Sequence, residues 1–356
     1  MEVPLFDLHR VLKEYNNELT SAFKNCMDHG RFILGPEVEG FEKTFAKKMN
    51  AKHCISVSSG TDALLAILMA LNLEPGSEII VPSFTFIASA SSIVRAGLKP
   101  VFVDLAPNSF KPSFDTIEGA WTEKTKGVLF VHLFGESTNL YDINQLCKSR
   151  GAVLIEDCAQ SYGAPVGNEG IAGAFSFFPA KNLGCLGDGG AIITNNDELL
   201  SNMKKIRGHG SKEKYNYELL GGNFRLDTIQ AAFLNVLLPH SDKWIAKRRG
   251  NAAYYSKHLQ ESKDLFLPKH CKGHSWNQYT LRTTRRGELK KYLDEKGIGN
   301  AVYYPYPLHK SKIFKFKNIL KETEKRCEEV ISIPVYPGLL EEEREYVVKK
   351  IKEFFK

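Results

Sequence analysis

The chain has 356 residues, of which 43% are hydrophobic and 25% charged, and its formal net charge is +7. This length exceeds one ordinary core, so we expect a large domain over residues 1–240 and a smaller one over residues 241–356. The sequence excludes a membrane-spanning helix, because no run approaches the roughly 18 uninterrupted apolar residues that one requires.

The basic residues are scattered, with only short clusters at residues 243–249 and 347–356. Solvated helix faces account for both clusters better than a nucleic-acid surface does. The first residues lack the basic and apolar regions of a secretory signal, and the seven cysteines are far apart with no C-x-x-C pair. We therefore expect a cytoplasmic protein without a metal site, a membrane contact or a nucleic-acid partner.

Short apolar runs alternate with helical stretches between residues 53 and 195. The runs are rich in Val, Ile and Phe and show little in–out alternation, which is typical of central strands covered on both faces. They lie at residues 54–58, 78–83, 100–105, 127–134, 152–159, 173–178 and 189–195. The pattern predicts an α/β fold whose central sheet is mostly parallel with helices on both faces. Ligands of such sheets bind at the carboxyl ends of the strands.

The pattern changes from about Arg225. Residues 225–238 and 242–260 predict two helices interrupted near Pro239, and a smaller α+β section follows with strands within residues 276–283 and 331–336. The last segment predicts an amphipathic helix with an apolar, core-facing stripe. That stripe comprises Val347, Val348, Ile351, Phe354 and Phe355.

The strand at residues 54–58 ends in Ser-Ser-Gly-Thr, directly before a predicted helix. The backbone N–H groups of Gly60 and Thr61 would form a seat for a phosphate at the helix N-terminus. An ordinary helix cap explains these residues equally well. After the next strand, Phe86 is suited to stacking on a flat heteroaromatic ring, although a phenylalanine in this position is more often a core residue.

The strand at residues 152–159 ends in acidic residues, Glu156 and Asp157, followed by Gln160. A carboxylate that leaves a buried strand requires a partner. A protonated pyridine nitrogen is one such partner, and a helix cap is the alternative. A metal fits poorly, because no His or Cys stands at ligand spacing.

Lys181 stands in the apolar, glycine-rich stretch of residues 175–190. Its amine either snorkels past an apolar collar or is held covalently by an aldehyde. Desolvation lowers the pKa of a buried lysine, and only the neutral amine attacks an aldehyde. Ser176, five residues earlier, could add a hydroxyl to the phosphate seat.

A phosphate turn, a stacking aromatic, an acid for a ring nitrogen and a lysine between strands occur here in that order, and together they are the groups that bind pyridoxal phosphate. The chain resembles the fold-type-I pyridoxal-phosphate enzymes and, among them, the DegT/DnrJ/EryC1/StrS family of nucleotide-sugar aminotransferases. The resemblance covers nearly the whole length and includes residues 30–46, 221–235 and 303–309.

The resemblance implies a role for each motif residue toward the cofactor. Lys181 would bond covalently to the cofactor aldehyde and act as the general base. Asp157 would pair with the pyridine nitrogen, Gln160 would hydrogen-bond the ring hydroxyl, and Phe86 would cover one face of the ring. The phosphate would be held by Gly60, Thr61, Ser176 and, from the other subunit of a homodimer, Asn223.

The resemblance also implies the substrates: an amino acid donor, expected to be L-glutamate, and a nucleotide-linked keto-sugar facing Tyr304 and His309. Residues 207–244 look most like the branch that aminates C3 of dTDP- or UDP-linked hexoses, and a 4-keto sugar is the alternative. Tyr303 and Glu136 stand where relatives often have histidine and glutamine, which leaves the identity of the sugar open.

Two other functions are compatible with the same fold: dehydration of a sugar and regulation without turnover. Relatives that dehydrate C3 of a sugar carry a histidine in place of the Schiff-base lysine, so Lys181 argues against dehydration. A regulator that retained the fold without turnover is the non-enzyme alternative. The intact Asp157, Lys181 and phosphate turn argue against it.

Overall fold

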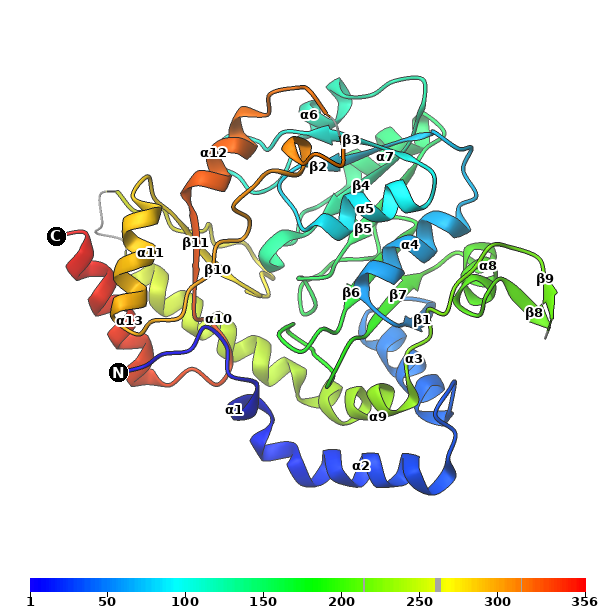
Figure 1. The fold of residues 1–356 in the computed structure, drawn as a ribbon, viewed down its shortest axis with the longest axis horizontal. Coiled ribbons are helices and arrows are strands. Elements are labelled where there is room, and N and C mark those ends of the chain that lie inside the picture. The colour runs from blue at the N-terminus through cyan, green and yellow to red at the C-terminus, as the bar shows by residue number, and fades with distance from the viewer. Residues whose placement is uncertain (214, 260–263, 315) are drawn as a thin grey trace.

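The computed structural model describes residues 1–213, 215–259, 264–314 and 316–356. Seven strands form a central sheet in the order β1-β7-β6-β5-β4-β2-β3 (Figure 1). They are β1 (His53–Val57), β2 (Glu78–Pro82), β3 (Lys99–Val103), β4 (Thr125–Val131), β5 (Val153–Asp157), β6 (Ala172–Ser176) and β7 (Gly190–Thr194). Only β7 runs antiparallel to its neighbours in this sheet, so the predicted mostly parallel α/β fold is confirmed.

The register of the central strands brings their polar ends to one edge of the sheet. Asp157, the last residue of β5, is paired with Val131 on β4 and with Ala174 on β6. Ser176 ends β6 opposite Gly190 at the start of β7. The residues that follow β5 and β6 therefore leave the sheet side by side.

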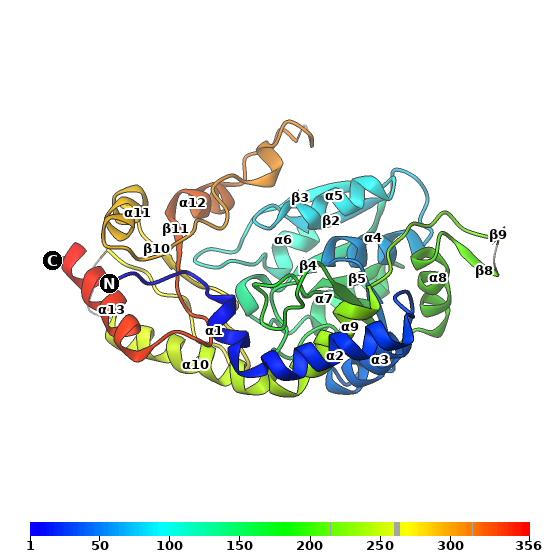
Figure 2. The ribbon, with the colours of Figure 1, turned by 60° about the horizontal axis from the view of Figure 1, so that its bottom comes forward.

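Helices cover both faces of the sheet, because its buried strands alternate side chains between two apolar layers. Leu129 of β4 faces one layer, while its neighbours Val128 and Phe130 face the other. The first layer contains α4 (Gly60–Ala70), α5 (Ile87–Arg95) and α8 (Asp197–Arg207). The second contains α3 (Pro36–Lys48), α6 (Phe114–Gly119), α7 (Tyr141–Ser149) and α9 (Thr228–Leu237). Figure 2 shows α4 and α5 above the sheet and α3 and α9 below it.

The N-terminal helices lie outside the second layer, and α2 packs on α9 (Figures 1 and 2). These helices are α1 (Leu8–Leu12) and the longer α2 (Asn16–His29). The short elements are the 3-10 turns Lys13–Tyr15, Leu133–Gly135 and Leu308–Lys310, and the hairpin of β8 (Ser211–Glu213) and β9 (Asn216–Tyr217). Lys214, between these two strands, lies outside the described residues.

A 3-10 turn at Leu238–His240, which includes Pro239, separates α9 from α10 (Ser241–His258), so the predicted interruption is confirmed. The predicted second helix extended to Gln260, which lies outside the described residues. The C-terminal section contains β10 (Tyr279–Arg282), which pairs antiparallel with β11 (Val330–Ile333). Its helices are α11 (Arg286–Glu295), α12 (Lys321–Glu329) and α13 (Glu341–Phe354).

A separate apolar cluster holds the C-terminal section together. It contains Val347, Val348 and Ile351 of α13, with Phe354 and Phe355 packed at its border, so the predicted core stripe is confirmed. Val3 belongs to the same cluster and is fully buried. Its backbone N–H donates to the carbonyl of Gly297 (2.8 Å), and its carbonyl accepts from the N–H of Gly299 (2.7 Å). The division of the chain at residue 240 remains a prediction.

Within the described part of the chain, no helix has the length and apolar character that crossing a bilayer demands.

Candidate active site

A cavity of about 470 Å³ opens at the carboxyl edge of the sheet. Its lining includes all but two of the predicted site residues, although these lining residues come from five different segments of the chain. The lining residues predicted from the sequence are Gly60, Thr61, Phe86, Asp157, Gln160, Ser176, Lys181 and Tyr304. The structure thus brings the four sequence motifs together around one cavity.

Lys181 lies in the turn between β6 and β7, where its backbone N–H donates to the carbonyl of Phe178 (2.8 Å). Burial lowers the pKa of its amine to about 8, and the nearby Asp157 carboxylate opposes that shift. The next residue anchors the turn, because Asn182 Nδ2 donates to the carbonyls of Tyr162 and Ser275, both at 3.1 Å. A neutral, nucleophilic amine is therefore accessible near physiological pH.

Asp157 is 5% exposed at the end of β5. Its Oδ2 accepts from the Ser89 hydroxyl (2.8 Å) and its Oδ1 from the backbone N–H of Ala159 (3.1 Å). Burial raises the pKa of this carboxyl, and the two hydrogen bonds partly oppose that effect. A protonated ring nitrogen in the cavity would supply the cation that a buried carboxylate requires.

The start of α4 and the end of β6 approach each other so closely that only glycine fits at residue 60. A Cβ atom there would lie 2.7 Å from the Cβ of Ser176. Ser59 caps the helix by accepting from the N–H of Asp62 (3.1 Å). The first amides of a helix lack intrahelical acceptors and attract anions. This helix start and the Ser176 hydroxyl together fit a phosphate group.

The remaining walls suit a flat ring. Gln160 is fixed at both ends of its side-chain amide: Oε1 accepts from the N–H of Phe134 (2.8 Å) and Nε2 donates to the hydroxyl of Tyr304 (3.2 Å). The rings of Tyr304 and Phe86 are 6.1 Å apart, and Phe86 is 53% exposed. An aromatic side chain held half-exposed at a cavity mouth is available to cover a bound ring.

Several lining residues were not predicted from the sequence. They are Ser59, Asp188, Asn277 and Gln278, together with Tyr303, which the sequence marks only as a departure from relatives. The signal for Asn277 and Gln278 was weak, because these polar residues immediately precede β10, far along the chain from the motifs.

The two predicted residues outside the lining have other surroundings. His309 is 1% exposed, and its Nδ1 and Nε2 lie 2.8 Å from Ser83 Oγ and 3.1 Å from Glu324 Oε1. These contacts join the residue-309 segment to the end of β2 and to α12, and they do not support contact with a sugar. Asn223 is exposed on the surface. The substrate role of His309 and the intersubunit role of Asn223 both remain predictions.

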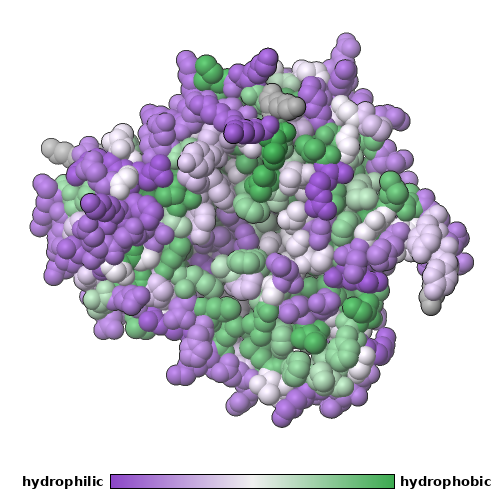
Figure 3. Space-filling view, viewed as in Figure 1, coloured by the Kyte–Doolittle hydropathy of each residue, from purple (hydrophilic) through white to green (hydrophobic). Residues whose placement is uncertain are grey.

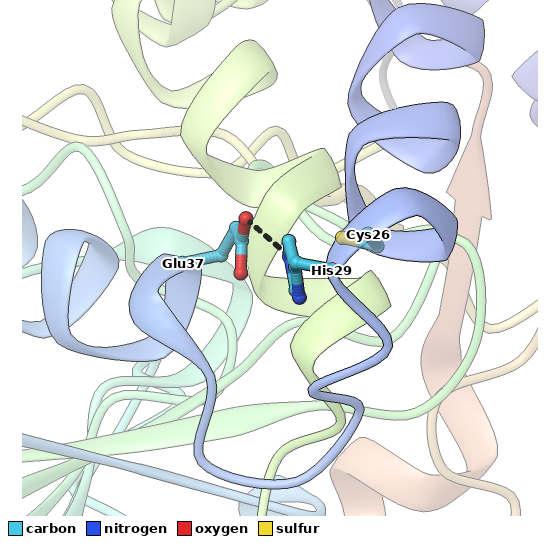
Figure 4. Close-up of side chains that lie close together, drawn as sticks. All are labelled: Cys26, His29 and Glu37. Atoms are coloured by element: carbon cyan, nitrogen blue, oxygen red, sulfur yellow. Dashed lines mark hydrogen bonds and ion pairs between the residues drawn. The ribbon is translucent and has the colours of Figure 1, made fainter.

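Cys26, His29 and Glu37 lie close together where α2 ends and α3 begins (Figure 4). The backbone N–H of Arg31 donates to His29 Nδ1 (3.0 Å), so the ring proton is on Nε2, which donates to Glu37 Oε1 (3.1 Å). Both ring nitrogens of His29 are thus used in hydrogen bonds. A metal bound to Nε2 would require the ring proton to be on Nδ1, where it would clash with the N–H of Arg31. We interpret this cluster as a junction between two helices.

The lysine and carboxylate in one cavity, the phosphate seat beside them and the sheet topology define a pyridoxal-phosphate-dependent aminotransferase of fold type I. The residues present fit each part of that cofactor. A family model described as the DegT/DnrJ/EryC1/StrS aminotransferase family matches residues 13–352, and the chain belongs to that family.

Individual relatives match over nearly their whole length. A protein of Geobacillus stearothermophilus described as a pleiotropic regulatory protein is 44% identical, and the match covers 100% of this chain and 99% of that one. A UDP-N-acetyl-3-dehydro-α-D-glucosamine 3-aminotransferase of Acidithiobacillus ferrooxidans is 37% identical, with 96% and 95% covered. The crystal structure of S. venezuelae DesV in complex with a ketimine intermediate is 36% identical, has a TM-score of 0.97, and shares 100% and 99% coverage.

Proposed function

We propose that the protein transfers an amino group from L-glutamate to the C3 keto group of a dTDP- or UDP-linked hexose. The observation that carries the transamination is the Lys181 amine and the Asp157 carboxylate facing one cavity beside a phosphate seat. The sugar class is supported by full-length relatives that are described as 3-aminotransferases of UDP- and dTDP-linked sugars.

Pyridoxal phosphate, when bound, supplies an electron sink for the negative charge that develops at the donor α-carbon. The residues of this chain hold and orient the cofactor and transfer the proton. Asp157 keeps the ring nitrogen protonated, Gln160 orients the ring, and the start of α4 with Ser176 holds the phosphate. Lys181, with its pKa lowered to about 8, takes the α-proton of the donor as a general base.

The test uses purified protein with pyridoxal phosphate, glutamate and two acceptors, a 3-keto and a 4-keto nucleotide-hexose. NMR locates the new C–N bond, and amination at C4 contradicts the C3 assignment. Lys181→Ala should lose turnover by roughly 10²–10⁴-fold or more, the contribution of a general base. Lys290→Ala, which removes an exposed ion pair with Asp294 on α11, is the matched control and should remain active.

A regulator without turnover is the second candidate, favoured by the description of the 44% identical relative. It predicts binding of the cofactor without amination of either sugar. Wild-type protein that forms an amino-sugar in the same assay rejects this candidate.

We propose a homodimer with shared active sites, built on an apolar face of α2 and the loop after it. This apolar face consists of Phe23, Met27, Phe32, Ile33 and Leu34, which are 39–53% exposed. Figure 3 shows apolar side chains gathered at the bottom of the view, in the region of α2 and α9. A contiguous exposed apolar surface of this kind is typical of an interface.

The apolar face is continuous with the segment that carries Asn223. Ile33 forms a β-bridge with Asp227, and the carbonyl of Phe32 accepts from the N–H of Thr228 (3.0 Å). A partner docked on this face would therefore lie next to the segment that carries Asn223. This adjacency supports the predicted role of Asn223 in binding the phosphate across the interface.

Mixing two inactive variants tests the shared site. Lys181→Ala removes the reactive amine, and Asn223→Asp removes the residue expected to reach the partner's phosphate. Random exchange of subunits makes about half of the dimers heterodimers, and each heterodimer has one intact site out of two. About a quarter of wild-type activity should therefore return. If Asn223 serves its own chain, mixing restores nothing. Sedimentation of each variant checks that dimers form.

We also place the protein in the cytoplasm, because all seven cysteines are free thiols, as expected in a reducing compartment. Cell fractionation tests this placement.

A further inference from the structure

Two buried hydroxyl groups lie beside the Asp157 carboxylate, on the segment that leads from β2 into α5. Thr85 precedes the helix and is 2% exposed, and Ser89 in its first turn is fully buried. The Ser89 hydroxyl donates to Asp157 Oδ2 (2.8 Å), and the hydroxyl oxygens of Thr85 and Ser89 are 3.0 Å apart. Buried hydroxyls are costly unless they are hydrogen-bonded, and the bonds of these two lead to the carboxylate of the candidate active site.

The number of protons fixes the direction of this hydrogen-bond chain. A hydroxyl carries one proton, and Ser89 gives its proton to the ionised Asp157, which can only accept. The contact between Thr85 and Ser89 is therefore donated by Thr85. The donations run from Thr85 to Ser89 to Asp157, and each one makes the next hydroxyl a stronger donor.

A protonated Asp157 would reverse the chain. Its Oδ1 accepts from the N–H of Ala159 (3.1 Å), so the added proton would lie on Oδ2 and point at Ser89, which would then donate to Thr85. The Thr85 proton would be left without an acceptor among the residues that the structure describes. An unmade hydrogen bond of a buried group costs free energy, so the chain favours the ionised form of Asp157.

The neighbouring carboxylate shows the effect of additional donors. Glu156, on the opposite face of β5, accepts from three backbone N–H groups at 2.7–2.8 Å and lies 3.0 Å from His132 Nε2. Burial raises the pKa of Glu156, but the His132 contact and the backbone bonds outweigh it, so that this pKa is lowered. Asp157 has fewer donors, and burial raises its pKa. Each donor to Asp157 is therefore important for its ionisation.

No charged side chain donates to the Asp157 carboxylate within the described parts of the chain. The titratable groups that interact with it electrostatically are Lys181, His132, Cys158 and Tyr304. None of them forms a hydrogen bond with it, because His132 Nε2 is engaged with Glu156 and the Tyr304 hydroxyl with Gln160, and Lys181 is the amine expected to bind the cofactor. Ser89 is thus the side chain on which the ionisation of Asp157 depends most directly.

We propose that Ser89 and Thr85 are positioning residues that act through Asp157: their hydroxyl chain keeps the carboxylate ionised and thereby keeps the ring nitrogen of the cofactor protonated. A protonated ring nitrogen is what makes pyridoxal phosphate an effective electron sink. The inference rests on the transamination in the proposed function, and it is independent of which keto-sugar accepts the amino group.

The test measures the ionisation of Asp157 in the apoprotein by carbon-13 NMR of its side-chain carboxyl, with Asp157→Asn to assign the signal. Ser89→Ala should raise the midpoint of this titration by roughly one to two pH units, the effect of losing one hydrogen bond to a charged group. Ser91→Ala is the matched control. It removes a hydroxyl from the same helix that bonds only the carbonyl of Ala88 (3.5 Å), so it should leave the midpoint unchanged.

Thr85 offers a second pair of variants. Thr85→Val removes the hydroxyl and retains the branched shape, so it should raise the midpoint in the same direction but by less, because Thr85 acts through Ser89. Thr85→Ser retains the hydroxyl and should titrate like wild type.

In the holoenzyme, nitrogen-15 NMR of ring-labelled pyridoxal phosphate reports the protonation of the ring nitrogen. In Ser89→Ala this nitrogen should lose its proton at a lower pH than in wild type, and the glutamate half-reaction should be roughly tenfold slower at saturating glutamate. If Ser89→Ala titrates like wild type, or Thr85→Val and Thr85→Ser titrate alike, the inference is wrong. If the titrations differ as expected but wild type takes no amino group from glutamate, the proposed function is wrong instead.

Discussion

Lys181 and Asp157 show how one cavity tunes two ionisable groups in opposite directions. Burial lowers the pKa of the lysine and raises that of the carboxyl, because each is less stable as an ion away from water. Each charged form partly stabilises the other. The Lys181 amine therefore has a pKa of about 8, against 10.5 for an ordinary lysine.

This shift predicts a pH dependence for aldehyde capture by the apoprotein. Only the neutral amine reacts, so the rate of covalent attachment of pyridoxal phosphate should fall about tenfold per pH unit below a midpoint near 8 and level off above it. Borohydride trapping followed by mass spectrometry of the Lys181 peptide measures this rate. A midpoint near 10.5, the ordinary lysine value, would show that the amine is not desolvated.

At the scale of elements, binding of the cofactor phosphate depends on the close contact between Gly60 at the start of α4 and Ser176 at the end of β6. Gly60→Ala places a Cβ atom 2.7 Å from that of Ser176 and forces the helix start away, so we expect pyridoxal phosphate to bind roughly 10²-fold more weakly. Fluorescence titration of the apoprotein measures this affinity.

Gly250→Ala is the matched control for that substitution. No atom lies within 4 Å of the added Cβ at this exposed position in α10, so it should raise the free energy of unfolding by about 0.5–1 kcal/mol and leave the cofactor affinity unchanged. Equal affinities for both variants would refute the proposed phosphate seat.

The arrangement of the elements also explains which parts of the fold and of the site could be predicted from the sequence. The alternation of apolar runs and helices predicts the sheet, and residues that directly follow its strands, such as Asp157 and Ser176, are predicted with it. The pairing of β7 with β1 and β6 is not encoded in any local pattern. Asn277 follows a positive φ at Trp276, and His309 lies in a single 3-10 turn, so no periodicity indicates which way either side chain points.

At the scale of the whole molecule, the chain's first residues complete the C-terminal core. Val3→Ala should lower the free energy of unfolding by about 2 kcal/mol, because a fully buried side chain loses two methyl groups and leaves a cavity. Val94→Ala, at a half-exposed position on α5, should change it by less than about 0.5 kcal/mol. Urea denaturation curves measure both values, and equal losses would contradict the packing of Val3.

The position of Val3 also sets an order of events during synthesis. Its hydrogen-bond partners, Gly297 and Gly299, leave the ribosome long after it does. The backbone of Val3 therefore lacks these two hydrogen-bond partners while the central sheet, which is synthesised before residue 297, folds. The segment around Val3 is therefore among the last to be packed, so a nascent chain stalled before residue 297 should leave this segment accessible to proteases.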